Sequence, residues 1–93
     1  AAANEPKDTM ARPRFDMAPA MEVVLETAVE IAGGDPARFA EREFYSCFPC
    51  VPKMARRALG LPEGTPPTVA GGLTFHGAPL NNYMLHAACA MVR

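Results

Sequence analysis

The stretch that decides the fold is residues 69–83, Val-Ala-Gly-Gly-Leu-Thr-Phe-His-Gly-Ala-Pro-Leu-Asn-Asn-Tyr. It is typical of a short strand, a glycine-rich loop and a helix. Gly71, Gly72 and Gly77 lack Cβ atoms, so the backbone there can turn sharply or approach another group closely. Pro79 suits the first turn of the following helix, whose unpaired N–H groups can hold an anion or a developing oxyanion. The same pattern is compatible with a tight connection that carries no chemistry.

Length places the chain among small domains or pieces of larger ones. A polypeptide of 93 residues buries only about 60–65% of the surface that it exposes when unfolded, so it is marginal alone. The sequence starts at Ala1 without a methionine and stops at Arg93 within an apolar helical pattern. We therefore expect a fragment of a longer polypeptide.

Charge and cysteine content exclude several classes of protein. Nine Lys and Arg against ten Asp and Glu give a net charge of −1. The sequence therefore lacks the excess of positive charge that is typical of proteins that bind nucleic acid or a membrane surface. The least charged stretch, residues 65–92, is interrupted by Pro79, glycines and asparagines, so no membrane span is expected. Three cysteines are too few for a disulfide scaffold, which favours a reducing, cytoplasmic setting.

Hydrophobic periodicity predicts alternating helices and strands. Residues 1–17 form an extended lead-in, and residues 18–93 form the domain. A helix is predicted from Pro19 to Ala32, and a second from the region of Pro49 and Pro52 to Leu59. Short strands are predicted at residues 44–46 and 68–70, and a last helix at residues 81–93. This order indicates an α/β layered architecture, in which the apolar last helix is buried on all sides.

The cysteines allow two hypotheses, a redox pair and a zinc site. Cys47-Phe-Pro-Cys50 is a C-x-x-C between a predicted strand and a helix, the place of a redox pair in thioredoxin-like oxidoreductases. With His86 and Cys89 the same pair makes a formal zinc set of three cysteines and one histidine. A C-x-x-C is short enough to occur by chance. Cys89 is also explained as a small apolar residue of a buried helix. We assign no metal ligands.

Other side chains are candidates for a site by their position. His76 lies in the glycine-rich loop, where it can face a cleft or simply point into solvent. Tyr45 ends a predicted strand, where α/β enzymes place functional residues, although ordinary packing explains it equally well. Asn82 is a candidate site residue and also a candidate helix cap, as is Asn81.

Two motifs together resemble the C-terminal half of the thiolase superfamily. They are Phe44-Tyr-Ser-Cys-Phe-Pro49 and the whole of residues 69–83, and the resemblance covers about residues 19–93. The chain is most similar to thiolase-like proteins described as acetyl-CoA acetyltransferase, relatives of the sterol carrier protein X type. The resemblance implies part of the layered αβαβα thiolase fold, with the last helix as one of its central, doubly covered helices.

The resemblance also implies roles for particular residues. The family carries Asn-Glu-Ala-Phe or His-Asp-Cys-Phe where this chain has Tyr45-Ser-Cys-Phe48, and the first residue orients a water or the thioester carbonyl. The family's Gly-His-Pro is here Gly77-Ala78-Pro79, so an alanine replaces the histidine that activates the nucleophilic cysteine. The nucleophile itself lies outside this stretch. The candidate catalytic residues are Tyr45, His76 and Asn82, and the candidate substrate-binding residues are Phe48, Gly72, Gly77 and Ala78.

Three functions follow as hypotheses. The first is a fragment of a thiolase-like acyl-CoA acyltransferase of lipid metabolism, with a coenzyme A thioester as substrate and no covalently bound cofactor. The second is a thiolase-fold aldolase or lyase on a CoA ester, with a zinc-ribbon/OB-fold partner protein. The third is a non-catalytic thiolase-like structural subunit. The resemblance further implies the rest of the thiolase polypeptide as a partner, and a homo-oligomer.

Overall fold

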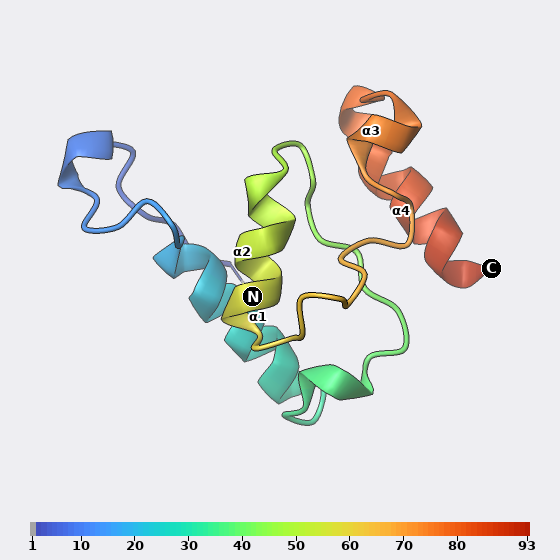
Figure 1. The fold of residues 1–93 in the computed structure, drawn as a ribbon, viewed down its shortest axis with the longest axis horizontal. Coiled ribbons are helices and arrows are strands. Elements are labelled where there is room, and N and C mark those ends of the chain that lie inside the picture. Colours follow the sequence, from blue (N-terminus) through green and yellow to red (C-terminus); the bar gives the residue numbers. More distant parts are fainter. Residues whose placement is uncertain (1) are drawn as a thin grey trace.

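A computed structural model describes residues 2–93, and every regular element among these residues is helical (Figure 1). Two of the α-helices lie side by side, α1 and α2, and the chain then continues to α3 and α4 at the opposite side of the molecule. The segments, in chain order, are η1 (Thr9–Ala11), α1 (Pro19–Ile31), η2 (Pro36–Arg38), α2 (Cys50–Ala58), α3 (Leu73–His76), η3 (Leu80–Asn82) and α4 (Tyr83–Val92).

The first predicted helix is confirmed as α1. Pro19 occupies its first turn, where a missing N–H is tolerated. At the other end, the N–H of Gly34 bonds to the carbonyl oxygen of Val29 at 2.8 Å, and Gly33 has a φ of 107°. These two glycines let the chain leave the helix in a backbone conformation that other residues rarely adopt.

The second predicted helix is confirmed as α2. Pro49 is its N-cap, and Pro52 in the first turn is buried together with Ala55. Arg56 and Arg57 lie in the last turn, where positive charge is favourable beside the unpaired carbonyl groups. The buried prolyl and alanyl side chains mark the face of α2 that turns inward, and α1 packs against this helix.

The predicted α/β architecture is wrong, because residues 2–93 contain no strand. The segments predicted as strands, 44–46 and 68–70, are irregular. The N–H of Phe44 bonds to the carbonyl oxygen of Pro67, the residue just before the second segment, at 3.0 Å. Pro66 and Pro67 have no N–H to donate, and the N–H groups of the two residues after Thr68 bond to a side chain instead. A regular ladder therefore lacks its donors, and the layered αβαβα thiolase fold is not observed.

The last helix forms as predicted, but its predicted burial on all sides is wrong. The 3₁₀ turn η3 leads into α4, and only Tyr83 and Ala87 of α4 are buried. On its other faces Leu85 is 61% exposed and Val92 is 88% exposed. The helix therefore covers the molecule with one face and leaves the rest of its apolar surface open.

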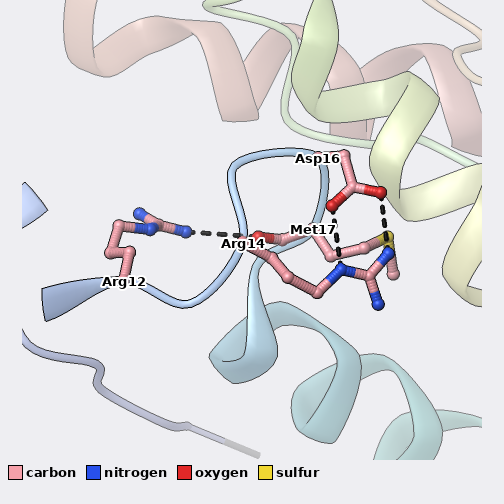
Figure 2. A network of polar contacts seen from close by, with 4 residues as sticks. All are labelled: Arg12, Arg14, Asp16 and Met17. Atoms are coloured by element: carbon pink, nitrogen blue, oxygen red, sulfur yellow. Dashed lines mark hydrogen bonds and ion pairs between the residues drawn. The ribbon is translucent and has the colours of Figure 1, made fainter. Parts of the chain in front are cut away.

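The segment before α1 is held by polar contacts near the start of that helix (Figure 2). Arg12 Nη2 donates to the carbonyl oxygen of Met17 at 3.3 Å. The carboxylate of Glu5 forms an ion pair with Arg12. Arg14 binds the two carboxylate oxygens of Asp16 at 2.9 and 2.7 Å. The predicted extended lead-in thus contains one short helical turn and ends at Met17, whose side chain is buried.

The surface is large for the size of the chain. The accessible area is 6724 Å², whereas a compact monomer of 10.0 kDa exposes about 5,200 Å². The radius of gyration, 13.8 Å, also exceeds the value of about 12 Å for a compact domain of this length. The buried hydrophobic residues are Met17, Ala55, Ala70, Tyr83 and Ala87, and Pro52 and Gly72 are buried as well. None of the helices in residues 2–93 is long and apolar enough to cross a lipid bilayer.

Candidate functional site

A pocket of about 440 Å³ lies where the first thiolase-like motif meets the glycine-rich loop and the start of α4. We call it the Tyr45 pocket. Its walls are formed by Tyr45, Cys47, Leu73, Ala78, Leu80, Asn81, Tyr83 and Met84. Its volume lies within the range of about 300–1,000 Å³ typical of small-molecule sites. The pocket brings together Tyr45 and Ala78, two candidate residues from separate motifs.

Tyr45 and Cys47 supply one wall of this pocket. Tyr45 is 52% exposed, so its hydroxyl is accessible to a ligand. Hydrogen bonding to the Cys47 thiol raises the pKa of Tyr45 above its ordinary value. The phenol therefore stays protonated at neutral pH and can donate a hydrogen bond.

The opposite wall has an uncommon backbone. Gly77 ends α3 in the left-handed region with a φ of 71°. Ala78 and Leu80, on either side of Pro79, also have positive φ values of 53° and 51°. Side chains other than glycine pay about 1–2 kcal/mol for this conformation, and such strain gathers at functional sites.

A polar network lies behind the pocket. The hydroxyl of Tyr83, a residue only 3% exposed, donates to Glu43 Oε1 at 2.6 Å and lies 2.6 Å from Ser46 Oγ. Burial, with a further contribution from the bond to Glu43, raises the pKa of Tyr83. Gly72 is buried beside this network, and a Cβ built on it would lie 3.2 Å from Ser46 Oγ. The glycine allows the loop to approach the Ser46 side chain.

His76 and Asn82 lie together, but they do not line the Tyr45 pocket. The rings of His76 and His86 meet edge to face, with centroids 5.6 Å apart. Asn82 Nδ2 lies 3.0 Å from His86 Nε2, although Asn82 makes no capping hydrogen bond to the helix that follows. The two candidate catalytic residues thus both contact His86 instead of Tyr45 or Ala78.

The remaining sequence candidates are dispersed. Phe48 is 65% exposed and does not line the pocket. All three cysteines have free thiols, so the C-x-x-C is not a disulfide here. No group of three or more His, Cys, Asp or Glu side chains suited to a metal occurs in residues 2–93. The zinc set considered from the sequence is therefore not assembled.

Glu43, Ser46 and Tyr83 are not among the site residues predicted from the sequence. Glu43 looks like an ordinary charged residue at the edge of a predicted strand, and Tyr83 like the end of a loop. No motif links them, because their hydrogen bonds join segments about 40 residues apart. Ser46 and Tyr83 lie inside the two thiolase-like motifs, and Glu43 lies one residue before the first of them.

Other hollows of the described residues contain none of the candidate residues, and two of them are similar in size to the Tyr45 pocket. One, of about 370 Å³, lies between the N-terminal segment and the start of α1, beside the Glu5–Arg12 ion pair. The other, of about 390 Å³, is lined by charged side chains of α2 and by Glu63. Among the hollows named here for residues 2–93, the Tyr45 pocket is the one that combines candidate motif residues, an accessible hydroxyl and a strained loop. Comparisons with protein-family models, with curated proteins and with solved structures found no match for this chain.

Proposed function

We propose that this chain is part of a thiolase-like acyl-CoA acyltransferase of the acetyl-CoA C-acetyltransferase type. Such an enzyme makes or breaks a carbon–carbon bond on a coenzyme A thioester. The observation that carries the proposal is the position of Tyr45 and Ala78 in one pocket. These are the positions at which the two motifs resemble the carbonyl-orienting residue and the catalytic histidine of thiolases.

Tyr45 has the chemistry that this role needs. Its protonated hydroxyl can donate a hydrogen bond to the thioester carbonyl oxygen, and that bond strengthens as negative charge develops on the oxygen. Ala78 can neither take a proton nor donate a hydrogen bond, so proton transfer falls to another group. Leu73, Leu80 and Met84 give the pocket apolar walls that suit an acyl chain. The proposed reaction needs no covalently bound cofactor.

The absence of a histidine at position 78 favours a second candidate function. His76, the nearest histidine in the sequence, contacts His86 and is not among the lining residues. A CoA-ester aldolase or lyase of the same superfamily, with Tyr45 as acid or base, fits a pocket without that histidine. A zinc-ribbon/OB-fold partner protein belongs with this second candidate.

The proposed partners are acyl-CoA, the rest of a thiolase polypeptide and further copies of the chain. The large accessible surface and the exposed apolar residues of α4 support protein contacts of this kind. The free thiols support a cytoplasmic location, because a reducing compartment keeps cysteines unpaired.

The test measures acetyl-CoA binding by calorimetry, together with acyl transfer and retro-aldol cleavage in the complete enzyme. Tyr45→Phe should lower kcat for acyl transfer by about 10²–10³, the usual effect of losing one oxyanion donor. Thr27→Val is the matched control, because it removes a hydroxyl that bonds within α1 to Val23, away from the pocket. Cleavage without transfer would favour the second candidate. Activities that Tyr45→Phe and His76→Ala leave unchanged would indicate a non-catalytic subunit and refute the proposal.

A further inference from the structure

One carboxylate joins the three segments that build the Tyr45 pocket. Glu43 Oε2 accepts the N–H groups of Val69 at 2.8 Å and Ala70 at 3.0 Å, at the start of the glycine-rich loop. Glu43 Oε1 accepts the hydroxyl of Tyr83, the first residue of α4, at 2.6 Å. We call this set of groups, with Ser46, the Glu43 hub.

The donor and the acceptor of each hydroxyl hydrogen bond in the hub can be assigned. A phenol has a single proton, and that of Tyr83 goes to Glu43. The 2.6 Å contact between Tyr83 and Ser46 must then be donated by the Ser46 hydroxyl. The hydrogen bonds therefore lead from the Ser46 hydroxyl to the Tyr83 hydroxyl and from there to the Glu43 carboxylate. Hydrogen bonds to a carboxylate are about twice as strong as those between neutral groups.

The hub lies where it can set the geometry of the pocket. Ser46 is flanked by Tyr45 and Cys47, which both line the pocket, and Tyr83 lines it as well. With no β-ladder between residues 44–46 and 68–70, the carboxylate of Glu43, the residue before Phe44, supplies two hydrogen bonds to the start of the glycine-rich loop.

We propose that Glu43 is a positioning residue, whose carboxylate holds the Tyr45–Cys47 segment, the glycine-rich loop and the start of α4 in register around the pocket. Its role in acyl-CoA chemistry rests on the proposed function, but its role in holding these segments does not. Glutamine replaces it only in part. Its one uncharged amide oxygen makes weaker bonds to the loop N–H groups than a carboxylate does, and its NH₂ group can only donate to the Tyr83 oxygen, which reverses the Tyr83–Ser46 hydrogen bond.

The first experiment needs no change in the hub. In the Tyr45→Phe chain, Tyr83 is the one remaining tyrosine, and its ionisation is followed by ultraviolet absorbance. We expect Tyr83 to ionise above the ordinary value of about 10, because it is buried and donates to Glu43. Ionisation at or below the ordinary value would overturn the proposal.

The second experiment compares Glu43→Gln with Glu41→Gln, an exposed carboxylate two residues earlier. We expect amide hydrogen exchange at Val69 and Ala70 to accelerate about tenfold or more in Glu43→Gln, through loss of charge-assisted bonds, and to stay unchanged in Glu41→Gln. Equal exchange in the two variants would overturn the proposal.

A third variant keeps the test decisive if Glu43→Gln does not fold. Tyr83→Phe retains the ring and removes only the hydroxyl that links Ser46 to the carboxylate. Alkylation of Cys47 should become severalfold faster in Tyr83→Phe, while exchange at Val69 and Ala70 stays protected. An unchanged alkylation rate would overturn the proposal. If the three hub experiments give the expected results but the protein does not bind acetyl-CoA, the proposed function is refuted and the role of Glu43 in holding the segments stands.

Discussion

Replacing Gly72 by alanine tests the close approach of the glycine-rich loop to the Glu43 hub. Gly72 has φ 74° and ψ −177°, a conformation that is almost confined to glycine and costs other residues about 1–3 kcal/mol. The new Cβ would lie 3.2 Å from Ser46 Oγ, closer than ordinary contact. That oxygen is held by its 2.6 Å bond to Tyr83, so moving it weakens a hydrogen bond worth about 0.5–1.5 kcal/mol.

The two effects together give an expected loss of about 2–4 kcal/mol in the free energy of unfolding. A chain of this length has a stability of about 5–14 kcal/mol, so Gly72→Ala remains folded but weakened. Urea unfolding followed by circular dichroism should show a midpoint lower by about 2 M. A Ser46→Ala background should recover part of the loss, because it removes the oxygen that the Cβ meets.

Two other glycines serve as matched controls. Gly60 has a φ of 64° with open space around its Cβ position, so Gly60→Ala measures backbone strain alone, about 1–2 kcal/mol. Gly64 has no positive φ and no neighbour within 4 Å, so Gly64→Ala should be neutral or stabilising by up to about 1 kcal/mol. The reasoning is refuted if Gly72→Ala costs no more than Gly60→Ala, or if its effect is simply additive with Ser46→Ala.

Three further predictions concern other parts of the chain. Ala87 is 1% exposed, so Ala87→Leu should destabilise by about 1–3 kcal/mol in urea unfolding, whereas Ala88→Leu on the exposed side of α4 should change stability by about 0.5 kcal/mol or less. Hydrogen bonding to Arg14 lowers the pKa of Asp16 in the folded chain. The contact therefore stabilises the fold above the unfolded pKa of about 3.9, and this stabilisation is lost as the pH falls through the pKa of Asp16 in the folded chain. An NMR titration should find the Asp16 pKa raised in Arg14→Gln, and no change would contradict the pairing. Cys47 is partly covered, so it should react with a thiol reagent more slowly than the two exposed cysteines, and equal rates would argue against its place in the pocket wall.

The helices were the predictable part of the fold. The spacing of apolar residues, with Pro19 at the start and Gly33 at the end, is local information, and α1 follows it within one residue. α2 ends one residue before the predicted Leu59, and α4 begins at Tyr83, two residues after the predicted start at residue 81. The helical character of both comes from their own side chains. Strands differ, because a strand exists only when a partner supplies donors and acceptors. Here Pro66 and Pro67, just before the predicted strand, have no N–H, and the Glu43 carboxylate binds the N–H groups of Val69 and Ala70.

The candidate site was predictable only in part. The motifs drew attention to Tyr45 and Ala78, and both line the pocket. His76 and Asn82 were chosen by their nearness in sequence to the same loop, but the turn through Gly77 directs them toward His86. Spacing along the chain does not reveal on which side of a short helix a side chain will lie.

The sequence alone determined where α1, α2 and α4 run, because helix periodicity, prolines at helix starts and glycines at helix ends act within a few residues of each other. Only the tertiary structure decided that Glu43, Ser46 and Tyr83 meet behind the pocket, and that residues 44–46 and 68–70 lie together without forming a sheet. The physical reason is that hydrogen bonds between distant segments depend on which donors and acceptors remain unpaired after the local helices have formed. Here a carboxylate took the loop N–H groups that a neighbouring strand would otherwise have bound.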